Sequence, residues 1–251
     1  MNNSISVRSL LVRGMLAGLV AGLLALAVAY VLGEPHIDAA IAFEESHAHD
    51  HGGGEEELVS RALQSTAGLA TGVLVYAVAL GGIAALAYAV MLGRIGRFSP
   101  RATAAVLAGA AFVSVYLVPF LKYPANPPAA TDPATINERT GTYFLMIALS
   151  VLLALAATVV GRRLAPRLGT WWATVAAGAV FVALVAAAFA VLPSFDEVPE
   201  HFSAELLYRF RLSALAVQLT LWTAFGLVFG HLAERLIAPA PAAAAEPVPV
   251  A

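Results

Sequence analysis

Residues 14–33 read GMLAGLVAGLLALAVAYVLG and contain no Asp, Glu, Lys or Arg. A helix rises about 1.5 Å per residue, so about 20 apolar residues cover the roughly 30 Å hydrocarbon core of a bilayer. Five further stretches are free of these residue types and at least as long: residues 62–93, 102–121, 140–161, 168–195 and 212–233. The sequence therefore predicts an all-α fold, a polytopic membrane helix bundle with six transmembrane helices.

The composition agrees with a chain that is embedded in a lipid bilayer. Of its 251 residues, 60% are hydrophobic and 12% are charged, whereas soluble domains are about 25% charged. The mean hydropathy is +0.82. A net charge of −2 offers no basic surface for nucleic acid, and the absence of cysteine excludes disulfides, thiolate metal sites and Cys nucleophiles.

The spans take up most of the chain, so we expect one transmembrane domain over residues 1–236. Within it, helices are expected at about residues 9–33, 64–93, 102–121, 140–162, 170–192 and 210–234. A His- and acid-rich outer loop is expected over residues 34–61. Residues 237–251 are rich in Ala and Pro, which predicts a disordered tail.

The first apolar stretch has a second interpretation. Arg8 and Arg13 precede it and Ala27-Val28-Ala29 is a weak cleavage pattern, so a signal peptide is the alternative. The stretch is longer than a usual signal-peptide core of about 7–15 residues, which favours an uncleaved first helix. Cleavage would leave five spans.

The distribution of basic residues predicts the orientation, because cytoplasmic segments are enriched in Lys and Arg. With the N-terminus inside, the inside segments hold nine basic residues: Arg8, Arg13, Arg94, Arg97, Arg101, Arg162, Arg163, Arg167 and Arg235. The outside segments hold five: Arg61, Lys122, Arg139, Arg209 and Arg211. We therefore predict that both termini are cytoplasmic.

The first outer loop concentrates side chains that bind metal ions. Neutral imidazole is a good ligand for Co²⁺, Ni²⁺, Cu²⁺ and Zn²⁺, and carboxylates add oxygen donors. The glycines at 52–54 give the segment the freedom to wrap an ion. We predict exchangeable capture of a divalent ion, with a solvated polar loop as the alternative. The predicted ligands are His47, His49, His51, Asp50, Glu44 and Glu45.

Just upstream, Glu34, His36 and Asp38 alternate along the chain. In an extended segment, alternate residues share a face. At the membrane mouth such a face suits an ion entrance, with these three residues as further metal ligands, and interface anchoring is the equally good alternative.

The apolar stretches contain no carboxylate. This disfavours a self-sufficient proton antiporter, which often keeps an Asp or Glu at mid-membrane. There is no helical His-Glu-x-x-His, which disfavours an intramembrane metalloprotease, and no nucleophile–base pair or ligand triad at helical spacing, so we expect no enzyme. There is no nucleotide-binding Gly-x-x-x-x-Gly-Lys-Ser/Thr, so ATP drive would need a separate protein. Arg139 and Arg211 flank the spans and could pair with Glu138, Glu205 or the acids of the first loop. Ordinary interfacial snorkelling is the alternative.

The order of several motifs resembles the CbtA family of probable cobalt transporter subunits of bacteria and archaea. The resemblance covers most of residues 8–236. Its most specific part is Tyr-Pro-Ala-Asn-Pro-Pro at residues 123–128. The other parts are Gly33-Glu34-Pro35 with Ile37-Asp38 and Glu44-Glu45, the His-rich first loop, Glu138-Arg139-Thr140, and Arg211 to Gln218 leading into Leu221-Trp222.

The resemblance implies Co²⁺ uptake across the cytoplasmic membrane of a prokaryote, to supply cobalamin synthesis. Ni²⁺ is not distinguished from Co²⁺. It also implies a small single-helix partner, CbtB, and the family is usually described with about five spans. The residues carried over from the resemblance include Glu34, His36, Asp38 and Glu44. Those carried over as a possible permeation path are Tyr123, Asn126, Glu138, Arg139, Arg211 and Gln218. A non-transporting scaffold or metal-sensing accessory subunit is the alternative function.

Overall fold

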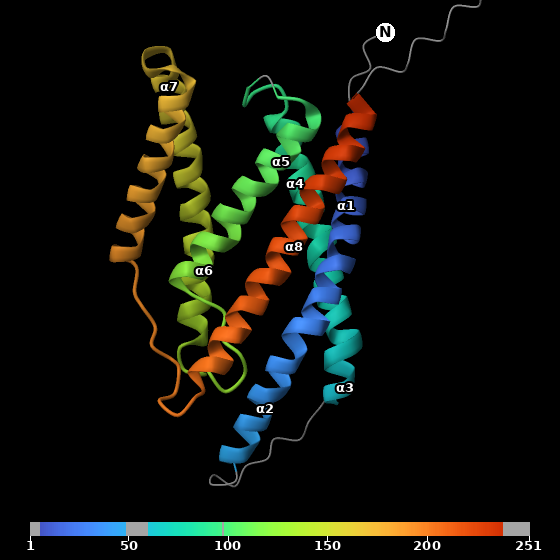
Figure 1. Ribbon diagram of the computed structural model, residues 1–251, viewed down its shortest axis with the longest axis vertical. Helices are drawn as coiled ribbons and strands as arrows, with labels where there is room; N and C mark the ends of the chain where they lie inside the picture. The colour runs from blue at the N-terminus through green and yellow to red at the C-terminus, as the bar shows by residue number, and fades with distance from the viewer. Residues whose placement is uncertain (1–5, 49–59, 97, 238–251) are drawn as a thin grey trace, which may run out of the picture.

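The computed structural model describes residues 6–48, 60–96 and 98–237, and this part of the chain contains helices and no strand. Figure 1 shows the arrangement. The α-helices are α1 (Val7–Val28), α2 (Glu34–Ala48), α3 (Arg61–Leu63), α4 (Leu69–Met91), α5 (Pro100–Ala111), α6 (Val118–Lys122), α7 (Ile136–Val191) and α8 (Ala204–Ile237). Three π-helical turns connect some of them: η1 (Ala29–Gly33), η2 (Gln64–Gly68) and η3 (Phe112–Leu117).

Within the described residues, five continuous helices are long and apolar enough to cross a membrane. They are Val7–Ser46, Arg61–Met91, Pro100–Lys122, Ile136–Val191 and Ala204–Ile237. Helices satisfy every backbone group internally, which a hydrocarbon environment requires. The prediction of an all-helical, membrane-compatible protein is confirmed.

The longest helix, α7, folds back on itself at Gly169. This residue has φ 74° and ψ 162°, a backbone conformation that favours glycine. A Cβ placed on Gly161 would lie only 3.0 Å from the Cβ of Ala177, whereas 16 residues of straight helix extend about 24 Å. The residues before and after Gly169 therefore form two adjacent antiparallel arms, as Figure 1 shows.

The connections gather at two ends of the bundle (Figure 1). One end, here called the basic end, holds the start of α1, residues 92–96 and 98–99, the turn of α7 and the end of α8. The other, here called the acidic end, holds α2, α3 and the segments 123–135 and 192–203. Among the described residues, every Asp and Glu except Glu234 lies at or next to the acidic end.

Residues 34–48 are helical, which corrects the expected loop and the expected extended strand of Glu34, His36 and Asp38. Pro35 lies in the first turn of α2, where a missing N–H is tolerated, and η1 supplies a wider π-helical turn just before it. In a helix, residues 34 and 38 still share a face because they are four apart, but residue 36 points elsewhere.

The core is centred on the contact between α1 and α4, where glycine allows the backbones to touch. A Cβ on Gly18 would collide with the carbonyl oxygen of Ala77, and one on Gly81 would collide with the carbonyl oxygen of Gly14. Small residues at helix interfaces permit this approach in membranes. Gly14, Gly18 and Gly22 follow each other at four-residue spacing on α1, and this face packs closely against α4.

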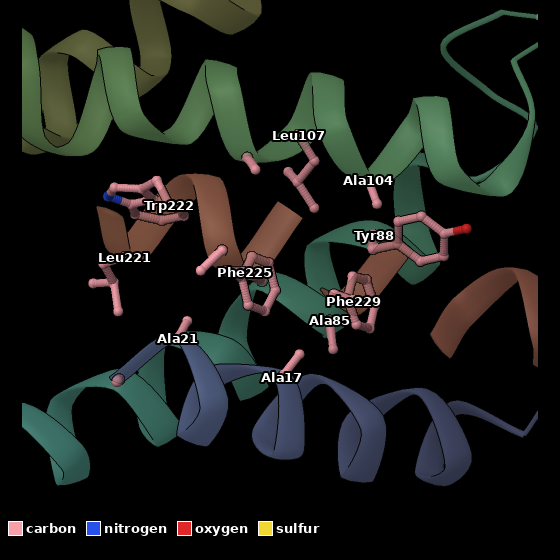
Figure 2. Packing of buried hydrophobic residues seen from close by; sticks show 14 of the residues in the cluster. Ala17, Ala21, Ala85, Tyr88, Ala104, Leu107, Leu221, Trp222, Phe225 and Phe229 are labelled. Carbon is pink, nitrogen blue, oxygen red and sulfur yellow. The ribbon is translucent and has the colours of Figure 1, made fainter. Parts of the chain in front are cut away.

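Helix α8 completes the core by packing its aromatic side chains between α1, α4 and α5 (Figure 2). Phe225 and Phe229 stack with ring centroids 5.2 Å apart, and Tyr88 meets Phe229 edge-on at 5.0 Å. The Tyr88 hydroxyl donates to the carbonyl oxygen of Pro100 at 3.2 Å, so its polar end is satisfied at the basic end.

The α7 arms pack beside this core mainly through η3 and α6. The buried Ser150 hydroxyl donates to the carbonyl oxygen of Ser114 in η3. A π-helical turn alters the regular i to i−4 bonding, and a serine from a neighbouring helix can satisfy a carbonyl that is freed in this way.

We predict that Gly18→Ala lowers the free energy of unfolding by about 1–3 kcal/mol, because one added methyl overpacks the α1–α4 contact. The matched control is Gly72→Ala on α4, where an added Cβ meets nothing within 4 Å. The control gains helix propensity and should be neutral or more stable by up to ~1 kcal/mol. Thermal unfolding in detergent measures both, and equal stability of the two variants would contradict the packing described.

Candidate functional site at the acidic end

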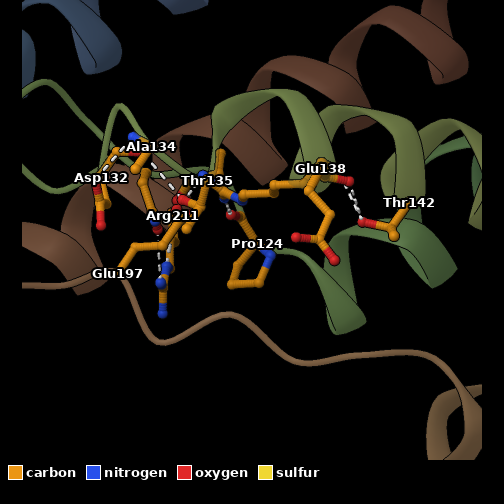
Figure 3. Close-up of polar contacts among 11 residues, drawn as sticks. Pro124, Asp132, Ala134, Thr135, Glu138, Thr142, Glu197 and Arg211 are labelled. Atoms are coloured by element: carbon orange, nitrogen blue, oxygen red, sulfur yellow. Dashed lines mark hydrogen bonds and ion pairs between the residues drawn. The ribbon is translucent and has the colours of Figure 1, made fainter.

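A buried carboxylate, Glu197, organises the polar side chains at the acidic end (Figure 3). Its side chain is 2% exposed, and Arg139 Nη1 donates to Oε2 at 2.8 Å. The Thr135 hydroxyl donates to Oε1, and Asn126 Nδ2 lies 3.4 Å from Oε2. Both oxygens of Glu197 are therefore engaged by donors, as a buried charge requires.

Two arginines bind the carbonyl oxygens of the proline-rich segment that follows Tyr123. Arg139 donates to the Pro124 carbonyl oxygen. Arg211 donates through Nε to the Ala125 carbonyl oxygen at 3.3 Å and through Nη2 to Asn126 Oδ1 at 2.8 Å. The prolines prevent regular helix here, so these carbonyls need side-chain donors. Asn126 links Arg211 on α8 to Glu197, and Glu197 in turn pairs with Arg139 on α7. These contacts therefore connect α8 with α7.

A second pair of residues holds the 192–203 segment against the end of α6. The Tyr123 hydroxyl donates to the Pro193 carbonyl oxygen at 2.9 Å. Lys122 Nζ donates to the Phe189 carbonyl oxygen at 2.9 Å and to Ser194 Oγ at 2.8 Å. These contacts cross-link the segments 123–135 and 192–203 with the ends of α6, α7 and α8, and this assembly is here called the cap.

Two cavities adjoin this cap and share Tyr123, Pro124 and Arg139 in their walls. The larger has a volume of about 440 Å³ and is lined by aromatic rings together with Thr131, Ile136 and Thr140. The rings belong to Tyr116, Phe120, Tyr123 and Tyr143. The smaller, here called the polar cavity, has a volume of about 210 Å³. Its charged lining residues are Lys122, Arg139, Asp196, Glu197 and Arg211.

Four of the six predicted path residues come together in this cap: Tyr123, Asn126, Arg139 and Arg211. Glu138 does not join them, since it is exposed and its backbone carbonyl accepts from Thr142. Gln218 lies about two helical turns further along α8, next to the Tyr76 hydroxyl. Its amide oxygen is buried without a hydrogen-bond partner in the structure.

The expected partners of the two arginines are corrected. Arg139 pairs with Glu197 rather than with Glu138 or Glu205, and Glu205 pairs with Arg209 on its own helix at 2.6 Å. Arg211 has no carboxylate within ion-pair distance in the described part of the chain. Nothing in the sequence singles out Glu197, because it is 58 residues from Arg139 and belongs to no motif.

The predicted metal ligands at residues 34–38 are engaged otherwise. Arg61 pairs with Glu34 and, at 2.9 Å, with Asp38. His36 Nδ1 lies 2.6 Å from the Leu32 carbonyl oxygen, so its ring bonds back to its own helix. The expectation that these three side chains share one face is wrong, because the segment is helical.

The histidine-rich part of the predicted metal site lies mostly outside the described residues. His49, Asp50 and His51 lie outside the described residues, as does the side chain of His47 on α2. Glu44 and Glu45 are exposed on α2. Among the described residues, no group of three or more His, Asp or Glu side chains converges to hold a metal ion. Capture by the histidine segment stays a prediction.

We predict that Glu197→Gln lowers the free energy of unfolding by roughly 3 kcal/mol, because it leaves the partly buried Arg139 without its counter-ion. The matched control is Glu205→Gln, which removes an exposed ion pair of small value. Thermal unfolding in detergent should show a clear loss for the first variant and little for the second. A Glu197→Gln protein as stable as the control would contradict the proposed role of this contact.

The chain was compared with protein families, curated proteins and solved structures. No curated protein and no solved structure matches the chain significantly. A family comparison matches residues 7–234 to CbtA, described as a probable cobalt transporter subunit. This match covers α1 to nearly the end of α8 and includes every residue of the cap. The chain therefore belongs to the CbtA family of probable cobalt transporter subunits.

Proposed function

We propose that the chain is the membrane subunit of a Co²⁺ uptake transporter that supplies cobalamin synthesis in a prokaryote. The observation that carries this proposal is the family match over residues 7–234, on a chain with five membrane-compatible helices in its described part. The chain has no catalytic role in this account. Ni²⁺ is a second possible cargo, because imidazole and carboxylate ligands do not separate it from Co²⁺.

The proposal includes six crossings of the cytoplasmic membrane with both termini inside. The fold-back at Gly169 supports it, because the arms of α7 are two apolar segments rather than one. The excess of Lys and Arg in the segments of the basic end supports a cytoplasmic location for that end. We also propose that the first helix is retained, because Ala17 and Ala21 of α1 are buried in the main core.

In this account, the ion is first captured outside by the histidine segment. Glu34 and Asp38 are both paired with Arg61, which leaves His47, His49 and His51 with their neighbouring acids as the ligands of choice. Weak, exchangeable binding suits capture, because an ion that binds too tightly would not be passed on.

Inward movement would use the membrane potential. A potential of 100 mV favours entry by about 2.3 kcal/mol per elementary charge, and a divalent ion carries two. The proposed path passes the aromatic cavity beside the cap, which Tyr123 and Arg139 line, and continues toward Gln218 on α8. Asn126 and Arg211 hold the proline-rich segment that borders this path, and Glu138 lies outside the cap. The family description as a subunit supports a partner, and we propose a CbtB-like single-helix protein in the same bilayer.

A non-transporting scaffold or metal-sensing accessory subunit is the second candidate. It is favoured by one specific observation: the two buried carboxylates of the described residues, Glu34 and Glu197, each pair with an arginine. Carboxylates that are paired in this way offer little to a passing cation.

An uptake assay separates the two candidates. We predict that cells of a cobalt-uptake-deficient strain accumulate radiolabelled Co²⁺ when the chain is expressed with its partner. Replacing His47, His49 and His51 by Ala should reduce uptake at low Co²⁺ by at least about tenfold. Changing even a residue that only supports a metal ligand costs about 10–100-fold, so removing three ligands should cost no less. The matched control is His201→Ala, an exposed histidine at the same end outside the segment.

The outcomes are distinguishable. Unchanged uptake by the triple variant would remove the histidine segment from the mechanism while leaving transport intact. No accumulation by the unaltered chain together with its partner would favour the scaffold.

A further inference from the structure

The residues that line the polar cavity carry more positive than negative charge. Five charged residues line it: Lys122, Arg139 and Arg211 against Asp196 and Glu197. Glu197 is committed to Arg139, and Asp196 is exposed to solvent. In the part of the chain that the structure describes, neither Lys122 nor Arg211 has a carboxylate within ion-pair distance.

These two cations are held in place by neutral groups. Lys122 donates to a carbonyl and a hydroxyl, and Arg211 donates to a carbonyl and an amide oxygen. Neutral acceptors position the side chains but do not cancel their charge. An ammonium has three N–H donors and a guanidinium has five, so donors remain after these bonds are made.

The cavity is unsuited to a free metal cation. Both oxygens of Glu197 already accept hydrogen bonds from Thr135, Arg139 and Asn126. A divalent ion placed here would face the fixed cations Lys122 and Arg211, and like charges at short range repel strongly in a partly buried site. The one lining carboxylate outside an ion pair among the described residues is Asp196, which is exposed to solvent. The observed charge balance calls for an anion instead.

We propose that the polar cavity binds a phosphate group, either on an anionic phospholipid or as free phosphate. The guanidinium fork and the ammonium are the side chains that most often bind phosphate oxygens. The cavity lies at the ends of α6, α7 and α8, where apolar helix gives way to polar segments and lipid headgroups are expected. Its volume of about 210 Å³ leaves room for a tetrahedral oxyanion.

Bound phosphate would complete the cap that joins α7 to α8. It would neutralise Arg211 and Lys122, which contact the 123–128 and 192–203 segments respectively. The site does not depend on the proposed transport function, because it follows from the charge balance of the cavity.

The test uses the full chain purified in a neutral detergent. Native mass spectrometry measures the retention of added phosphatidylglycerol or phosphatidylcholine, and inorganic phosphate is titrated separately as a competitor. We expect the anionic lipid to bind more tightly than the zwitterionic one. Arg211→Gln should weaken this binding about tenfold, since a charge-assisted contact is lost. The matched control Arg209→Gln, which lies in an exposed pair two residues away, should not weaken it.

Each outcome decides the proposal. If millimolar phosphate displaces the lipid, or binds with the same dependence on Arg211, the ligand is free phosphate. If phosphate has no effect, the ligand is the lipid headgroup. Equal effects of Arg211→Gln and Arg209→Gln, or no binding of any probe, would overturn the proposal. Should Arg211→Gln fail to fold, Lys122→Gln tests the same cavity with the same expectation.

Discussion

Backbone groups within a bilayer have no water to bond to, and the rest of this structure depends on that constraint. Each apolar stretch must be helical, and each departure from the regular pattern needs a local partner. At η3, the hydroxyl of Ser150 supplies such a partner for the Ser114 carbonyl. With little hydrophobic force between helices in lipid, close packing holds them together. The glycine contacts between α1 and α4 therefore form the centre of the bundle.

The ion pairs of the described residues lie at the two ends of the bundle. The α7 arms meet the rest of the bundle through η3 and α6, where Val118, Tyr123 and Met146 form an apolar cluster separate from the main core. At the acidic end, Arg139, Glu197, Asn126 and Arg211 form a continuous chain of contacts from α7 to α8. These contacts set the position of the arms relative to the core, and they separate an aromatic cavity from a positively charged one.

The charge-free stretches predicted the helices, because length and apolarity are local properties. The stretches 140–161 and 168–195 match the two arms of α7, and Gly169 explains why one continuous helix can contain both. The 34–38 segment was predicted wrongly, because alternation in sequence does not exclude a helix that follows a π-helical turn. The pairing of Arg139 with Glu197 could not be predicted, since it depends on the tertiary arrangement of segments 58 residues apart.

The proposed topology places the acidic end outside the cell and takes α7 across the membrane twice. Because the chain lacks cysteine, single Cys replacements at Asp132, Arg163 and Asp196, all exposed, report orientation without interference. The most direct measurement is labelling of intact cells with a membrane-impermeant maleimide. The account predicts that positions 132 and 196 react in intact cells and that position 163 reacts only after lysis. Reaction of all three positions in intact cells, or of position 163 alone, would contradict it.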